Sequence, residues 1–184
     1  MNIALFGGSF DPPHKAHLKI IKKATKILDI DRLIVMPTYL NPFKTDSFAP
    51  ATKRLKWLKK ASKNFKNVIV SDYEIRQNRS VYTIESINYL NSIGYNVKYL
   101  IIGADNLHSL KRWKNYEELS KLIEFVVVSR DKIAVPDRYK RLNLNINISS
   151  TYLRESLNKK YIPKKIKKNV IKHYRENYGK IRKN

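Results

Sequence analysis

The sequence predicts an α/β fold: a Rossmann-like, doubly wound and mostly parallel sheet of five to six strands flanked by helices, with a C-terminal helical extension. Short apolar runs alternate along the chain with segments of helical periodicity. Glycine or proline directly follows several of these runs. The length of 184 residues suits one α/β domain with a substantial core. We therefore expect residues 1–184 to form a single domain, with residues 155–184 packed on it as the extension.

Composition excludes several classes of protein. The chain has no cysteine, which rules out disulfides and thiolate metal sites and fits a reducing compartment. The apolar run near the N-terminus covers only residues 3–6, too few for a signal peptide. No run approaches the roughly 20 apolar residues of a membrane span. We expect a cytoplasmic protein.

The formal net charge of +23 at pH 7 raises the possibility of a nucleic-acid binder. The positive residues are spread along the chain and no nucleic-acid motif accompanies them. They also suit a lysine-rich surface that attracts small anionic substrates. We expect neither a nucleic-acid nor a membrane partner. The oligomeric state, monomer or homodimer, stays open.

The first strand and the turn after it organise the prediction. Residues 3–6 read as a buried strand, and Gly7 and Gly8 allow a ligand to approach the backbone closely. A helix over residues 12–28 follows, with Asp11 as the expected N-cap. Its free N–H groups make an anion site.

His14 and His17 are three residues apart, so on a helix they share a face near that anion site. A phosphate chain would suit this arrangement, although paired histidines on a helix are often only structural.

The remaining elements follow in order. Further strands are expected over residues 33–36, 68–70, 97–102 and 125–130, with a short sixth strand over 145–148 and an irregular segment over 131–143. Helices are expected over residues 51–62, 82–90 (with Thr83 as the cap), after Asp105, from Ser149 onward and over 161–184. Arg54 is expected to face outward. Residues 72–76 read as a charged strand end or loop.

The last helix is an amphipathic one. Apolar residues recur in it every four positions, namely Ile162, Ile166, Val170, Tyr174 and Tyr178. We expect this stripe to pack on the domain with the lysines in water. Binding to RNA or to a membrane surface is the alternative.

Charged side chains follow several strands at the edge where the carboxyl ends of parallel strands meet. Lys44, in the loop after the second strand, could reach a phosphate as a point charge. Asp105 could accept from ribose hydroxyls or cap a helix, and Arg130 could meet a phosphate or form a surface ion pair. Asp72 and Glu74 could form a metal-binding pair, but carboxylates in this position more often belong to a solvated edge. No metal site is therefore expected.

A second phosphate-binding element begins near the other end of the chain. Ser149, Ser150 and Thr151 start a helix, and Arg154 lies one turn further on. Alone this is an ordinary helix cap. Two helix N-termini directed at one phosphate chain are a stronger indication than either alone.

The run from Gly7 to His17, Gly-Gly-Ser-Phe-Asp-Pro-Pro-His-x-x-His, resembles the signature of the nucleotidyltransferase superfamily with a His-x-Gly-His motif, with Ala16 at the glycine position. Residues 103–113 (Gly-Ala-Asp…Leu…Trp) and the Tyr82-Thr83 segment are similar to bacterial nicotinate-nucleotide adenylyltransferases. Residues 148–154 resemble the Ile-Ser-Ser-Thr-x-x-Arg element of the same superfamily.

This resemblance implies an adenylyltransferase that joins ATP and nicotinate mononucleotide into deamido-NAD and pyrophosphate, with Mg²⁺ carried by ATP. It implies four catalytic residues: His14, His17, Lys44 and Arg154. It implies an ATP site made of Gly7, Gly8, Ser9, Phe10, His17, Gly103, Asp105, Ser150, Thr151 and Arg154. Together with the strand-edge position of Arg130, it implies a nicotinate-mononucleotide site made of Lys44, Tyr82, Thr83, Asp105, Trp113 and Arg130.

Transfer between phosphates suits a chain that offers phosphate-binding turns and cations, because positioning and charge stabilisation supply most of that catalysis. The sequence has no P-loop, no Gly-x-Ser-x-Gly and no cysteine nucleophile. Two alternatives stay open. One is another adenylyl- or cytidylyltransferase of the superfamily, for example of the phosphopantetheine type. The other is a basic RNA-binding domain.

Overall fold

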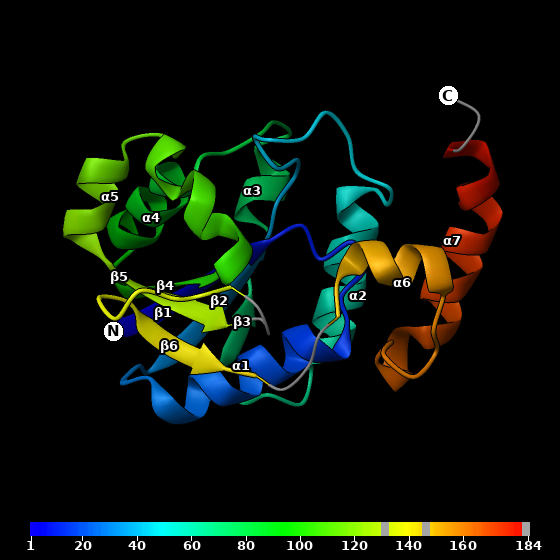
Figure 1. Cartoon of the computed structure of the whole chain (residues 1–184), viewed down its shortest axis with the longest axis horizontal. Coiled ribbons are helices and arrows are strands. Elements are labelled where there is room, and N and C mark those ends of the chain that lie inside the picture. The colour runs from blue at the N-terminus through cyan, green and yellow to red at the C-terminus, as the bar shows by residue number, and fades with distance from the viewer. Residues whose placement is uncertain (130–132, 145–147, 182–184) are drawn as a thin grey trace.

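A six-stranded parallel sheet forms the centre of the protein (Figure 1). The structure, a computed structural model, describes residues 1–129, 133–144 and 148–181, with side chains up to residue 177. The strands are β1 (Asn2–Gly8), β2 (Arg32–Pro37), β3 (Val68–Val70), β4 (Asn96–Gly103), β5 (Glu124–Ser129) and β6 (Lys140–Asn143). Their order is β3-β2-β1-β4-β5-β6, and every pair is parallel. The predicted doubly wound α/β fold is confirmed.

Helices cover both faces of the sheet and one flank (Figure 1). They are α1 (Lys15–Ile27), α2 (Ala51–Ser62), α3 (Tyr73–Arg76), α4 (Thr83–Ser92), the 3₁₀ helix η1 (Ala104–Arg112), α5 (Tyr116–Leu122), α6 (Ser150–Ser156), the 3₁₀ turn η2 (Lys164–Ile166) and α7 (Lys167–Ile181). None of them, in the part of the chain that is described, is both long and apolar enough to cross a membrane.

The alternation of side chains along β1 builds two cores. Ile3 and Leu5 pack on one face against the helices α4 and α5. Ala4 and Phe6 pack on the other face against α1 and Leu58 of α2. A third core joins α2, α6 and α7. It contains four of the five residues of the predicted C-terminal stripe; the side chain of Tyr178 lies outside the described residues.

The sixth strand lies earlier than predicted. β6 pairs with β5 from Val126 opposite Lys140, in the segment expected to be irregular. It is an edge strand with the sequence Lys-Arg-Leu-Asn, and only Leu142 is buried, so apolar alternation could not reveal it. Of the predicted 145–148 strand, residues 145–147 lie outside the described residues, and Ile148 belongs to no strand.

The segment after β3 is also different from the prediction. Tyr73–Arg76 forms the short helix α3, not a strand end or loop. An ion pair of 3.1 Å between Asp72 Oδ1 and Arg76 Nε spans one turn of it. Glu74 points inward and is only 5% exposed, so it is not part of a solvated edge.

Candidate active site

The strand order reverses between β1 and β4, and the carboxyl ends of these strands define the candidate site. Gly8 lies opposite Pro37 of β2, and Thr38 N donates to Gly8 O at 3.0 Å. Gly103 ends the neighbouring strand β4. The glycine turn, the loop after Pro37 and the Gly103 segment therefore share one edge of the sheet, as predicted.

His14 and His17 lie at the start of α1. His14, not Asp11, is the N-cap, so that prediction is wrong. His17 N donates to His14 Nδ1 at 3.4 Å, and His14 N donates to His17 Nδ1 at 3.1 Å. The rings stack with centroids 3.6 Å apart. Because each Nδ1 accepts a backbone N–H, the neutral form of each ring carries its proton on Nε2.

Asp11 has another role, which explains why it does not cap the helix. Its carboxylate is buried and accepts from Phe48 N at 2.8 Å (Oδ2) and from the Tyr174 hydroxyl (Oδ1). Its carbonyl accepts from Arg154 Nη1 at 2.6 Å. Burial and the neighbouring carboxylate raise the pKa of Tyr174, so its hydroxyl stays protonated and donates. Three distant segments thus converge on Asp11.

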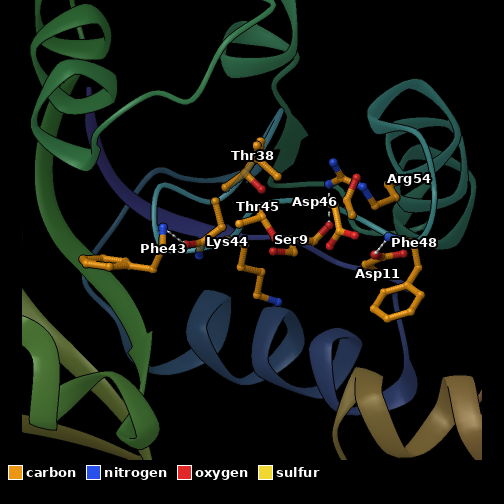
Figure 2. Close-up of a pocket in the computed structure, with 12 residues that line it drawn as sticks. Ser9, Asp11, Thr38, Phe43, Lys44, Thr45, Asp46, Phe48 and Arg54 are labelled. Carbon is orange, nitrogen blue, oxygen red and sulfur yellow. Dashed lines mark hydrogen bonds between the residues drawn. The ribbon is translucent and has the colours of Figure 1, made fainter. Parts of the chain in front are cut away.

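Arg54 was expected to face outward, but it is fully buried. Its side chain lies among the residues that line the cavity (Figure 2). Its guanidinium donates to three carbonyls, Ala49 at 2.9 Å (Nε), Ser9 at 2.6 Å (Nη1) and Tyr39 at 2.7 Å (Nη2). Desolvation lowers the pKa of this group, and the charge of Asp11 opposes the change. Arg54 therefore ties the glycine turn to both ends of the loop after β2.

The second predicted phosphate element lies beside the first. α6 begins at Ser150, and its N-cap Ser149 accepts from Tyr152 N at 3.0 Å. Ser150 Oγ donates to Pro12 O at 3.2 Å. Arg154 Nη2 donates to Thr151 Oγ1 at 2.9 Å. Since Arg154 also reaches Asp11, residues from the two ends of the chain meet at the start of α1.

A cavity of about 340 Å³ opens between the glycine turn and the loop after β2 (Figure 2). Ser9, Asp11, Thr38, Lys44, Phe48 and Arg54 are among the residues that line it. The Thr38 hydroxyl is buried and has no hydrogen-bond partner in the described part of the chain. Phe48 packs its ring 4.1 Å from the Arg154 guanidinium carbon. The walls of the cavity carry two cations, Lys44 and Arg54, and two carboxylates, Asp11 and Asp46.

The glycines differ in the space around them. A Cβ added at Gly7 would lie in open space, whereas one at Gly8 would touch the Phe10 ring at 3.4 Å. One at Gly103 would lie 2.2 Å from Asp105 Oδ1, so the Asp105 side chain folds back over this glycine. Phe10 adopts a positive φ of 48° and packs its edge against His17, with centroids 4.9 Å apart.

Three of the residues predicted for the second substrate, Tyr82, Thr83 and Trp113, lie around the starts of α4 and α5. Thr83 begins α4, but Tyr82 is the N-cap, and Tyr82 N donates to Glu85 Oε1 at 3.0 Å. The Tyr82 ring is exposed, and Lys114 Nζ lies 4.6 Å from its centroid. Trp113, next to this lysine, packs against the core under η1. Arg130 lies outside the described residues.

Sequence reasoning missed Arg54 as well as the contacts of Asp11, Phe48 and Tyr174. A signal existed for Arg54, because Ala51, Arg54, Leu58 and Ala61 follow helical spacing and all four are buried. The other contacts join segments between 37 and 163 residues apart and leave no local pattern.

The Glu74 carboxyl has a pKa raised from 4.5 to about 7, chiefly by desolvation and despite a hydrogen bond from Ser86 Oγ at 2.9 Å. The folded state therefore binds more protons than the unfolded state between these values. Stability contributed by this group is fully present below pH 4.5 and is lost as the pH rises to about 7. The loss is on the order of 3 kcal/mol.

We expect Glu74→Gln to remove this decrease. Urea unfolding of both proteins between pH 4.5 and 8 measures the difference in their free energies of unfolding. The other titrating groups are the same in both proteins and cancel in this difference. Parallel stability curves for the two proteins would contradict the assignment.

Comparison with known proteins agrees with this geometry. Residues 5–156 match the model of the cytidylyltransferase-like family. A "Probable nicotinate-nucleotide adenylyltransferase" of Sulfurimonas denitrificans is 49% identical over 97% of this chain and 97% of its own. A protein of the same description from Campylobacter fetus is 49% identical over 96% of this chain and 98% of its own. The structure of "Plasmodium falciparum nicotinic acid mononucleotide adenylyltransferase complexed with NaAD" superposes with a TM-score of 0.78 at 19% identity, covering 95% of each chain, and so supports the fold.

Proposed function

Because the chain belongs to the cytidylyltransferase-like family and, within it, to the nicotinate-nucleotide adenylyltransferases, we propose that it transfers the adenylyl group of ATP to nicotinate mononucleotide. A 5′-phosphate oxygen of the mononucleotide forms a bond with the α-phosphorus of ATP. The bond from that phosphorus to the bridging oxygen breaks, and pyrophosphate leaves with its electron pair. The attacking oxygen is already ionised near neutral pH, so no general base is required.

One observation carries the assignment of roles: Arg154 and Ser150 contact the segment Asp11–Pro12 at the start of α1. This convergence allows one triphosphate to meet cations and donors from both ends of the chain. His14 and His17 present protons on Nε2 that would stabilise charge at the α-phosphate. Arg154, with Ser150 and Thr151, would hold the β- and γ-phosphates.

The remaining binding roles follow the sequence prediction. Gly7, Gly8, Ser9 and Phe10 would lie along the phosphates, and Gly103 with Asp105 along the ribose. Lys44, on the cavity wall, would neutralise the approaching phosphates. Tyr82, Thr83 and Trp113 would receive the nicotinate part, and Arg130 is proposed for the same substrate.

ATP would bring Mg²⁺, coordinated mostly by phosphate oxygens and water. Both oxygens of Asp11, the carboxylate at the turn, already accept hydrogen bonds. Within the described residues no three His, Cys, Asp or Glu side chains form a metal site. This donor set fits an ion carried by the nucleotide.

We further propose a single domain with residues 155–184 as its extension, acting in the cytoplasm.

The direct test is pyrophosphate release from ATP or CTP with each of three acceptors: nicotinate mononucleotide, nicotinamide mononucleotide and phosphopantetheine. We expect ATP with nicotinate mononucleotide to give the highest kcat/KM. A preference for CTP or phosphopantetheine would move the chain to another branch of the family. Release with none of them, together with strongly salt-dependent RNA binding, would favour the RNA-binding alternative.

Gly7→Ala tests the ATP site without disturbing the fold, because the added methyl lies in open space. A methyl forced into a close-packed contact costs about 1–3 kcal/mol, so we expect KM for ATP to rise about tenfold with an unchanged Tm. Gly94→Ala is the matched control. Gly94 has φ = +89°, so alanine should lower Tm by a few degrees and leave KM unchanged. An unchanged KM for Gly7→Ala would show that ATP does not approach this glycine.

A further inference from the structure

The C-terminal helix α7 reaches the walls of the candidate site. Its Tyr174 is 1% exposed, and the hydroxyl donates to Asp11 Oδ1. The neighbouring His173 is also buried, and its Nε2 lies 3.3 Å from Phe48 O. Since a carbonyl oxygen only accepts, His173 Nε2 carries the proton and donates. Its Nδ1 then accepts from Lys53 Nζ at 3.1 Å.

Phe48 is held at both of its backbone groups. Its N–H donates to Asp11 Oδ2 at 2.8 Å, and its carbonyl accepts from His173. Its ring packs 4.1 Å from the guanidinium carbon of Arg154, which in turn donates to Asp11 O. Phe48 and Asp11 also line the cavity (Figure 2). A displacement of Phe48 would therefore change both the cavity wall and the surroundings of Arg154.

The rest of α7 explains how two side chains can hold this position. Val170 of α7 and Ile166 of the preceding turn η2 are buried with Trp57 and Leu153 in the core that joins α2, α6 and α7. The helix is thus fixed to the two elements that carry Arg54 and Arg154. The rings of His173 and Tyr174 pack against Trp57 of this core, with centroids 5.5 and 5.9 Å away, and their polar atoms reach Phe48 O and Asp11 Oδ1.

We propose that α7 is a positioning element of the active site: Tyr174 and His173 fix Asp11 and Phe48, and through them they orient the Arg154 guanidinium toward the nucleotide phosphates. This inference rests on the proposed function. It assigns the C-terminal extension a role in binding ATP in addition to its contribution to stability. Neither residue lines the cavity, so both are assigned as positioning residues.

Four variants of the full chain test the proposal. Tyr174→Phe removes one hydroxyl and keeps the ring, whereas His173→Leu removes the donor to Phe48. His173→Gln restores an amide donor for Phe48 and an acceptor for Lys53. Val170→Ala is the control, because it weakens the apolar packing of α7 and removes none of the hydrogen bonds to Asp11 or Phe48. Each variant is measured for Tm, for kcat and KM with ATP, and for ATP affinity by calorimetry.

We expect Tyr174→Phe and His173→Leu to raise KM and Kd for ATP about tenfold, as the loss of one hydrogen bond to a positioned group predicts. Val170→Ala should lower Tm at least as much as these two variants do but keep KM for ATP within about twofold of the wild-type value. His173→Gln should return KM for ATP to the same range. If Tyr174→Phe does not fold, the Leu and Gln variants of His173 decide.

Equal KM values in the positioning variants and in Val170→Ala would overturn the proposal, and so would a failure of His173→Gln to restore KM. Calorimetry separates this outcome from a failure of the proposed function. A wild-type chain that binds ATP but releases no pyrophosphate overturns the proposed function. The Kd values of the variants for ATP, compared with the wild-type value, still decide the positioning role.

Discussion

His17→Ala should reduce kcat/KM for adenylyl transfer about 10²–10³-fold, the effect expected when one donor to developing charge is removed from a preorganised site. The neutral His17 ring carries its proton on Nε2, because Nδ1 accepts from His14 N at 3.1 Å. The His14 ring, stacked at 3.6 Å, and the Phe10 edge, at 4.9 Å, fix the plane of the imidazole. The donor therefore needs no reorganisation when charge develops on the phosphate.

The main difficulty is that His17 also belongs to the helix cap, so alanine lowers stability by about 1 kcal/mol as well. His17→Asn separates the two roles, because its side-chain oxygen can take the place of Nδ1 but nothing reaches the position of Nε2. We expect the Asn variant to keep Tm and to be nearly as inactive as the Ala variant. His17→Gln, whose amide nitrogen reaches the Nε2 position, should recover part of the activity. Near wild-type turnover of folded His17→Ala would refute the mechanism.

The sheet and its ligand-binding edge were predictable because their signals are local. Strands buried on both faces read as continuous apolar runs, and Gly7 and Gly8 directly follow the run over residues 3–6. Parallel strands place all carboxyl ends at one edge, so the prediction that the residues after successive strands share this edge needed only the strand positions. The polar edge strand β6 has no such run and was misplaced.

The walls of the site were not predictable in the same way. Asp11 has the residue type and position of a helix cap, and only the folded chain shows that Phe48 and Tyr174 occupy its carboxylate. These donors are 37 and 163 residues away in the sequence. A local rule fails here because a buried carboxylate gains more from charge-assisted bonds to distant donors than from one exposed cap. The hydrogen bonds that hold the site join distant segments of the chain, whereas the sequence patterns that predict it are local.

Arg54→Met should destabilise the fold by about 3–5 kcal/mol, although Met fills a similar volume. The substitution leaves the carbonyls of Ala49, Ser9 and Tyr39 without their donor. The hydrogen bond to Ala49 is buried and the other two are partly buried. An acceptor that loses its partner away from water costs about 1–3 kcal/mol, and relief from burying the guanidinium offsets only part of this sum. For a chain of this size the expected decrease in Tm is about 10 °C.

Arg54→Lys should recover little, because an ammonium group lacks the planar fork that reaches three carbonyls at once. Arg76→Met is the matched control, since Arg76 makes only a surface ion pair and its loss should cost less than about 1 kcal/mol. Urea unfolding of the three variants measures these differences. If Arg54→Met lost no more stability than Arg76→Met, the three carbonyls would have to find other donors, and the turn and the loop after β2 would not depend on this arginine.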